Sequence, residues 1–255
     1  MERTIRDFSH MVDKLNDSFA ELDLAQRLVL IGELAEHAVF TTSLGMEDQI
    51  ITWGIANSAQ NIEVATLQTG RLFPETLDLI QQTRERFRID IKEYKPNPAN
   101  LQKYIDKFGK DGFYDSIQAR KACCFVRKLE PLAKALEGAD VWVTGLRRGQ
   151  SQDRSSIDFV EWDAERGLLK VNPLADWSSG DVKETIAIHD IPVNPLHAKG
   201  FPSIGCAPCT RAIQPSEDER AGRWWWEQQN TRECGLHVAS DEASIDAETK
   251  VQGNA

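Results

Sequence analysis

Short apolar segments alternate with amphipathic ones along most of this 255-residue chain, and this alternation limits the possible folds more than any other feature. Strands are predicted at residues 38–41, 62–67, 89–94 and 141–144, with helical patterns between them. Strands that alternate with helices form parallel sheets, because each crossover helix carries the chain back to the same edge. We therefore expect an α/β fold in which helices flank a parallel, twisted sheet.

The remaining segments extend this prediction to the whole chain. Residues 1–37 carry apolar side chains at three- and four-residue steps, which predicts an N-terminal helical segment. The last fifteen residues are polar, so we expect a flexible C-terminal segment. We divide the chain into this helical segment (1–37), an α/β domain (38–227) and a mobile tail (228–255). Further predictions are helices from 74, at 116–136, at 179–189 and from 216, two strands within 157–171, and a loop after 94.

Three turns of the predicted sheet bring hydroxyls, glycines and arginines to one edge. Ser43 and Gly45 follow the first strand, Thr69 follows the second, and Gly145 and Arg147 follow the fourth. Ligands of such sheets bind beyond the carboxyl ends of the strands. The first of these turns resembles a phosphate-binding loop, because backbone N–H groups at a helix start attract anions. It lacks the lysine of a Walker A loop, so ordinary ATP hydrolysis is not indicated.

The charge of the chain limits its partners. A formal net charge of −10 argues against nucleic acid, which requires a basic surface. A small anionic ligand fits better, because basic residues form local clusters. No run of 18 apolar residues and no basic-then-apolar leader occurs, so we expect a soluble cytoplasmic protein with no membrane partner. The clustered basic residues are Arg120, Lys121, Arg127, Lys128, Arg147, Arg148, Arg154, Arg211, Arg220 and Arg223.

The cysteines divide into two close pairs and one single residue. Cys123 and Cys124 are adjacent, Cys206 and Cys209 form a Cys-x-x-Cys, and Cys234 stands apart. An odd count argues against a disulfide framework and favours metal binding or redox chemistry. The two pairs could hold zinc or an iron–sulfur cluster. Adjacent cysteines on a helix point about 100° apart, which favours a cluster over the usual zinc knuckles.

Aromatic and histidine residues give weaker signals. Three consecutive tryptophans, 224–226, cannot all face one core, and we expect them to anchor the C-terminal segment or to contact a ligand. His189, His197 and His237 fit no common zinc spacing with the cysteines, so we expect them to be structural.

Six segments together resemble the assimilatory sulfonucleotide reductases, of the bacterial adenylyl-sulfate (APS) reductase type. They lie in order between residues 38 and 237. The chain departs from the family pattern in two places, both on the nucleotide side: Gln68 replaces the usual Asp, and the usual Ser-x-Ser-Gly turn reads Thr42-Ser43-Leu44-Gly45. The segments are Thr-Gly-Arg-Leu-Phe-Pro-Glu-Thr (69–76), Lys-Ala-Cys-Cys-Phe-Val-Arg-Lys (121–128), Gly-Leu-Arg-Arg (145–148), Gly-Cys-Ala-Pro-Cys-Thr-Arg (205–211), Gly-Arg-Trp-Trp-Trp-Glu (222–227) and Glu-Cys-Gly-Leu-His (233–237).

This resemblance implies an adenine nucleotide α-hydrolase-like fold and a thioredoxin-dependent reduction of APS to sulfite and AMP in sulfate assimilation and cysteine biosynthesis. It implies that Cys234 is the nucleophile and forms a Cys-S-sulfonate. A reduced thioredoxin or glutaredoxin-like protein would be the donor, and a homo-oligomer is compatible with it. By the same resemblance, Cys123, Cys124, Cys206 and Cys209 would hold a [4Fe–4S] cluster, and the substrate would contact Ser43, Gly45, Leu67, Thr69, Arg127, Lys128, Gly145, Arg147, Arg154, Arg220 and Arg223.

Three alternatives remain open. One is a reductase of 3′-phosphoadenylyl sulfate (PAPS), or of both nucleotides, although the paired cysteines favour APS because PAPS reductases lack them. The second is a nucleotide-binding module built on a Cys₄ zinc site. The third is an ATP-dependent adenylating enzyme, which the incomplete phosphate loop disfavours.

Overall fold

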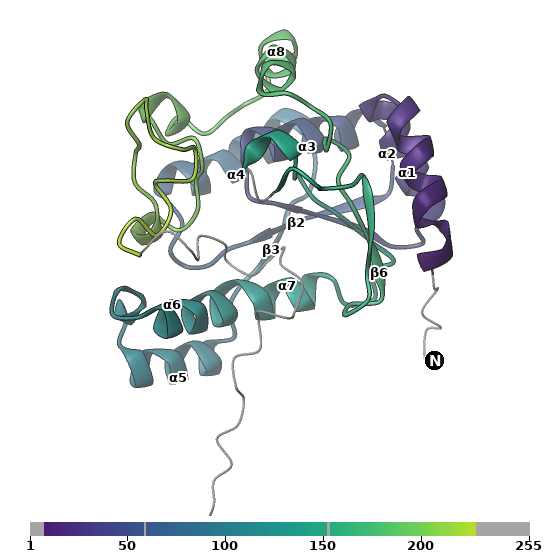
Figure 1. The fold of residues 1–255 in the computed structure, drawn as a ribbon. Coiled ribbons are helices and arrows are strands. Elements are labelled where there is room, and N and C mark those ends of the chain that lie inside the picture. The colour runs from purple at the N-terminus through teal and green to yellow at the C-terminus, as the bar shows by residue number, and fades with distance from the viewer. Residues whose placement is uncertain (1–7, 59, 152–153, 228–255) are drawn as a thin grey trace, which may run out of the picture.

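The computed structural model describes residues 8–58, 60–151 and 154–227. Its centre is a six-stranded sheet of order β3-β2-β1-β4-β6-β5 (Figure 1). All neighbouring strands are parallel except β5 and β6, which are antiparallel. The predicted α/β sheet is thereby confirmed. The strands are β1 (Ala38–Thr42), β2 (Ile62–Leu67), β3 (Lys92–Tyr94), β4 (Val141–Val143), β5 (Val160–Asp163) and β6 (Leu168–Val171).

Helices cover both faces of this sheet (Figure 1). On one face, Phe40 and Val143 pack into a core that includes Phe19, Leu28 and Ile51. That core joins the N-terminal helices to the sheet. The helices of the described chain are α1 (Val12–Glu21), α2 (Leu24–Leu34), α3 (Met46–Ser58), α4 (Pro74–Phe87), α5 (Pro98–Phe108), α6 (Ile117–Cys124), α7 (Glu130–Ala135) and α8 (Ser179–His189).

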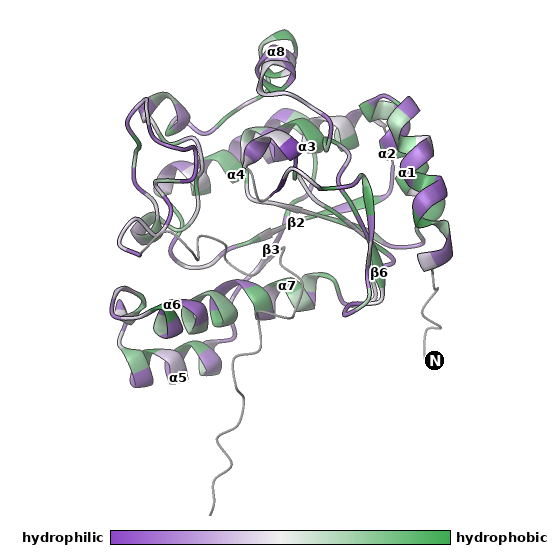
Figure 2. Ribbon diagram, viewed as in Figure 1, coloured by the Kyte–Doolittle hydropathy of each residue, from purple (hydrophilic) through white to green (hydrophobic). Residues whose placement is uncertain are grey.

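On the opposite face, Val39, Ala65 and Trp142 pack against Leu132 and Ala135 of α7. Alternate residues of β1 therefore face different layers, as the pleat of a strand requires. In Figure 2 most helices carry hydrophobic residues on one side and hydrophilic residues on the other. This amphipathic pattern is what a helix between a sheet and solvent shows.

The predicted loop after residue 94 is wrong in its second half, because α5 begins at Pro98. The Asn97 side chain accepts hydrogen bonds from the backbone N–H groups of Ala99 (2.9 Å) and Asn100 (3.2 Å). Pro98 occupies the first helical position, where its missing N–H costs nothing. An Asn-Pro pair that suggests a loop is here a helix start.

The helix predicted from residue 216 is also wrong. Glu217 pairs with Arg211 (2.6 Å) and accepts the backbone N–H of Gln214 (2.8 Å). Asp218 accepts the backbone N–H of Arg220 at 2.8 Å. These acidic side chains stabilise turns instead of a helix, so the acid-rich run indicated the wrong structure. The helix at 179–189 and the strand pair within 157–171 are confirmed.

The helix predicted over 116–136 is present but irregular. Between α6 and α7 the backbone forms one π-helical turn, Phe125–Leu129. Pro131 explains it, because proline has no N–H to donate four residues back and its ring crowds that carbonyl. The π turn directly follows Cys124 and contains Arg127 and Lys128. Such turns are frequent at functional sites.

Candidate functional site

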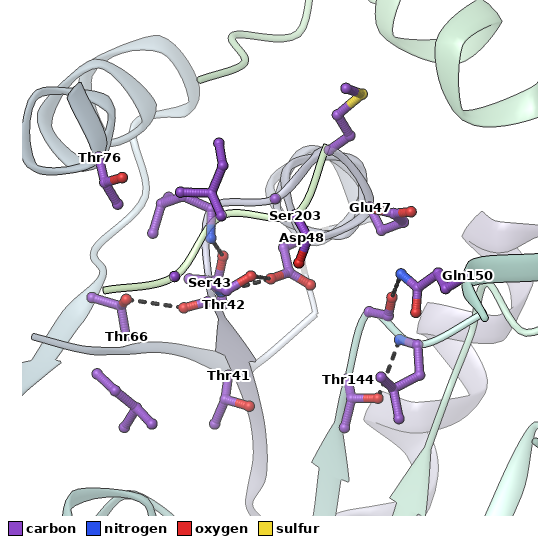
Figure 3. Close-up of a pocket in the computed structure, with 18 of the residues that line it drawn as sticks. Thr41, Thr42, Ser43, Glu47, Asp48, Thr66, Thr76, Thr144, Gln150 and Ser203 are labelled. Atoms are coloured by element: carbon purple, nitrogen blue, oxygen red, sulfur yellow. Dashed lines mark hydrogen bonds between the residues drawn. The ribbon is translucent and has the colours of Figure 1, made fainter. Parts of the chain in front are cut away.

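A cavity of about 250 Å³ opens at the carboxyl ends of β1, β2 and β4, where the turns were predicted to meet. Figure 3 shows Ser43, Asp48, Thr66, Thr144 and Gln150 around it. The predicted substrate residues that line the cavity are Ser43, Gly45, Leu67, Thr69, Lys128, Gly145, Arg154, Arg220 and Arg223.

The turn after β1 is stabilised by a carboxylate from the first turn of the following helix, α3. Asp48 Oδ2 accepts hydrogen bonds from the backbone N–H (2.6 Å) and the hydroxyl (2.7 Å) of Ser43 (Figure 3). Burial raises the pKa of Asp48 to about 6, and the two bonds from Ser43 oppose that shift. Gly145 packs against this carboxylate so closely that a Cβ there would lie 2.0 Å from Asp48 Oδ1. The Ser43 donors are therefore already engaged in this structure.

Among the described residues, four cations line the cavity: Lys128, Arg154, Arg220 and Arg223. The guanidinium of Arg223 is buried against Gly205 and lies 4.7 Å from the ring centroid of Trp224. Guanidinium groups suit the planar recognition of phosphate and sulfate oxygens. This part of the cavity can therefore bind a dianionic group.

Two of the predicted substrate residues do not line this cavity. Arg127 donates to the backbone carbonyl of Thr69 at 2.6 Å and faces a second, smaller cavity. Arg147 is buried and pairs with Glu47 at 2.7 Å. Both arginines therefore stabilise the wall of the cavity through residues that line it.

The four paired cysteines meet around the second cavity. Cys123 and Cys124 come from the end of α6. Cys206 directly precedes a short 3₁₀ turn, and Cys209 is the last residue of that turn. That turn is fastened to the β2–α4 connection, because the Ala207 N–H donates to the carbonyl of Arg71 at 2.7 Å.

The two cavities share a wall. Lys128 and Cys206 line both of them. Thr69, which lines the larger cavity, places its hydroxyl 3.3 Å from the Cys206 sulfur. A group bound by the cysteines would therefore lie next to a ligand in the larger cavity.

Burial in the cysteine site disfavours free thiolates, and nearby cations only partly offset this effect. Burial raises the pKa of Cys209 to about 12, while Lys128 and Arg223 lower it. Burial also raises the pKa of Cys123, against the effect of Arg127. Buried thiolates need a positive partner. Within the described ranges, no three His, Cys, Asp or Glu side chains converge on a single point as ligands of one metal ion would. Four thiols around one cavity are a donor set into which an iron–sulfur cluster would fit.

As expected, the consecutive tryptophans do not all face one core. One histidine differs from its expected structural role. Trp224 is 1% exposed and packs with the cysteines, whereas Trp225 is 39% exposed. His197, expected to be structural, lines the larger cavity, and its Nδ1 lies 2.8 Å from the carbonyl of Phe201. Its spacing to the cysteines gave no signal, because residues that line a cavity have no fixed interval in the sequence. Asp48 and Gln150 are further lining residues that sequence reasoning missed.

Cys234 and His237 lie outside the described residues, as does the predicted mobile tail. No described helix is long and apolar enough to cross a membrane.

Comparison with known proteins shows which family the chain resembles. Residues 37–212 match the model of the phosphoadenosine phosphosulfate reductase domain. An adenosine 5'-phosphosulfate reductase of Sinorhizobium fredii (strain USDA 257) is 58% identical over 231 residues, which are 91% of this chain and 92% of that protein. One of Allochromatium vinosum is 55% identical over 199 residues, 78% of each chain.

Among solved structures, the phosphoadenylyl-sulfate (PAPS) reductase of Candida auris, in a phosphate complex, superposes with a TM-score of 0.67. It is 24% identical and covers 78% of this chain and 95% of its own, which supports the shared fold. The extent of the domain match and the identity to the bacterial reductases place the chain in a known family. It belongs to the phosphoadenosine phosphosulfate reductase domain family.

Proposed function

We propose that this protein reduces adenylyl sulfate to sulfite and AMP, with reduced thioredoxin or a similar dithiol protein as the donor. The observation that carries the proposal is the pair of adjoining cavities. One is lined by four cations, and the other is ringed by four cysteines. The relatives named as adenosine 5'-phosphosulfate reductases support APS as the substrate.

The larger cavity has a suitable place for each part of the nucleotide. Leu67, Leu132 and Trp142 provide apolar surface for an adenine ring. Lys128, Arg220 and Arg223 provide charge for the phosphate and sulfate. A unit-charge pair 4 Å apart gains about 4 kcal/mol at an effective dielectric near 20, so several cations would bind the anion firmly.

The reaction then needs one nucleophile, and Cys234 is the cysteine left over from the paired set. Its thiolate attacks the sulfur of APS, an S–S bond forms, and the S–O bond breaks as AMP leaves with the electron pair. A donor thiolate next attacks the Cys234 sulfur, and sulfite leaves with the S–S electron pair. The second donor thiol closes a disulfide in the donor and restores Cys234, so the donor supplies both electrons and two protons are released.

Cys123, Cys124, Cys206 and Cys209 would hold a [4Fe–4S] cluster, which supplies a fixed local charge when bound. The cavity wall they share with Lys128 supports a role in orienting that lysine beside the substrate. Thiolates in this number and a thioredoxin donor fit a reducing compartment, so we place the protein in the cytoplasm. The tail 228–255 would present Cys234 first to the nucleotide and then to the donor.

Replacing Cys234 with Ser tests this proposal. We expect sulfite release from APS to be abolished, because a hydroxyl is a far weaker nucleophile than a thiolate at neutral pH. AMP should still bind, and the purified variant should keep bound iron and absorbance near 400 nm. Sulfite release at the wild-type rate would refute the nucleophile. Zinc in place of iron would instead favour the zinc-module alternative.

A further inference from the structure

The last described residue, Glu227, forms a buried ion pair with Arg120. Arg120 Nε and one terminal nitrogen donate to the two carboxylate oxygens of Glu227, at 2.8 and 3.0 Å. The side chains are only 1% and 4% exposed. This two-bond geometry fixes the direction of Glu227 as well as its position.

Arg120 belongs to the cysteine site. Arg120 lies three and four residues before Cys123 and Cys124 in α6, so all three side chains share one side of that helix. Arg120 also lines the cysteine cavity and lies 4.8 Å from the ring centroid of Trp224. The ion pair is therefore built onto the helix that carries the first cysteine pair.

The segment 224–227 is tied to the second cysteine pair as well. The Trp224 N–H donates to the carbonyl of Cys209 at 3.2 Å, and the Glu227 N–H donates to the carbonyl of Trp224 at 2.9 Å. The position of Glu227 thus depends on both halves of the cysteine site.

Stability alone does not explain such a pair. Removing two charges from water costs several kcal/mol per ion, and apolar replacements of buried pairs are often as stable. What the pair adds is a defined geometry at the point where the tail begins. Cys234 follows Glu227 by seven residues, which span at most about 25 Å when extended. A fixed starting point therefore limits where the Cys234 thiol can go.

We propose that Arg120 and Glu227 are positioning residues that anchor the start of the tail to the cysteine-bearing helix, so that Cys234 meets the bound nucleotide. This inference rests on the proposed function. Loss of the anchor slows the attack of Cys234 on APS, while nucleotide binding and the cysteine site remain intact. A misplaced group can cost up to about 100-fold in rate without touching the reacting atoms.

Glu227→Gln provides the test, because it keeps the side-chain shape and removes the carboxylate charge that pairs with Arg120. The formation of Cys234-S-sulfonate is followed by mass spectrometry in a single turnover with APS and no dithiol. We expect the rate constant to fall about tenfold or more. AMP affinity and the absorbance near 400 nm should stay within twofold of wild type. Arg120→Lys keeps the charge but loses the two-bond geometry. Its sulfonation rate constant should lie between those of wild type and Glu227→Gln.

A matched control comes from the same part of the chain. Arg211 and Glu217 form another two-bond pair, at 2.6 and 2.9 Å, but about a third of each side chain is exposed. Glu217→Gln should leave the sulfonation rate within twofold of wild type.

Two results would overturn the anchor. One is wild-type sulfonation by both Glu227→Gln and Arg120→Lys. The other is a loss of AMP binding or cluster absorbance that matches the loss of rate. If the wild-type protein itself forms no sulfonate on Cys234, the proposed function fails first. If wild type, Glu217→Gln, Glu227→Gln and Arg120→Lys all form the sulfonate at the same rate, the positioning role of the ion pair is refuted and the proposed function stands.

Discussion

Among single residues, the Asp48 carboxylate stabilises the wall of the larger cavity, but its burial lowers the stability of the folded protein at neutral pH. It is 7% exposed, packed against Gly145 and bonded twice by Ser43. Its folded-state pKa of about 6 exceeds the ordinary value of 3.8. Between these values the folded protein holds a proton that the unfolded chain releases, so stability falls as pH rises from about 4 through 6. Above that window the buried carboxylate costs about 3 kcal/mol.

Asp48→Asn should remove this dependence, because its amide oxygen can accept hydrogen bonds from Ser43 without carrying a charge. We compare the free energy of unfolding of the variant with that of wild type. The difference, variant minus wild type, should increase by up to about 3 kcal/mol between pH 4 and pH 7. Urea unfolding at both pH values measures it. The exposed Asp78→Asn serves as control and should show a smaller change. A constant difference between variant and wild type across this range would contradict the explanation.

Residue types were easier to predict than their directions. The paired cysteines were recognisable as candidate ligands, because two closely spaced cysteine pairs in one chain suggest a common metal or cluster site. Arg127 and Arg147 carry the expected charge, but one bonds the Thr69 carbonyl and the other bonds Glu47. Sequence gives the charge of an arginine, whereas its direction depends on which acceptors the fold brings within reach.

At the scale of elements, Pro131 sets the geometry of the helix that joins the two cavities. The π turn Phe125–Leu129 adds one residue to a helical turn, which rotates the preceding residues by about 100° relative to α7. Lys128 lies in that turn and lines both cavities. The proline thus helps to aim a lysine that the proposed substrate needs.

Pro131→Ala should restore a regular helix and raise the free energy of unfolding, by up to about 3 kcal/mol. It should also raise KM for APS several-fold, because Lys128 would turn away from the anion. Pro98→Ala is the matched control, since Pro98 occupies the first position of α5 and should leave KM unchanged. A more stable Pro131 variant with wild-type KM would show that the π turn does not position the lysine.

Elements with strong local signals were predictable. The helix α8 carries a capping box of Ser178 and Asp181 and was predicted within its observed bounds. The helix α5 was missed because Asn97 and Pro98 occur equally in loops and at helix starts. The break before α7 could have been expected from Pro131, but its π form depends on the packing of both neighbouring helices.

At the scale of the whole molecule, the parallel sheet brings turns far apart in sequence to one edge, and this result followed from the alternation of strands and helices. The meeting of the two cysteine pairs did not follow from local pattern. It depends on the fastening of the Cys206–Cys209 turn to the β2–α4 connection. The cysteine spacing allowed a shared zinc or cluster site, the family resemblance specified the cluster, and no local rule predicted the Arg120–Glu227 pair.

Reduction of adenylyl sulfate is the activity that we propose for the site formed by these adjoining cavities. Its most direct test is sulfite release from APS and from PAPS, at matched concentrations, with reduced thioredoxin as the donor. We predict a kcat/KM for APS that exceeds the value for PAPS about tenfold or more, a difference of about 1.4 kcal/mol in transition-state binding. Equal or faster reduction of PAPS would contradict the substrate assignment, and no sulfite from either nucleotide would contradict the proposed function.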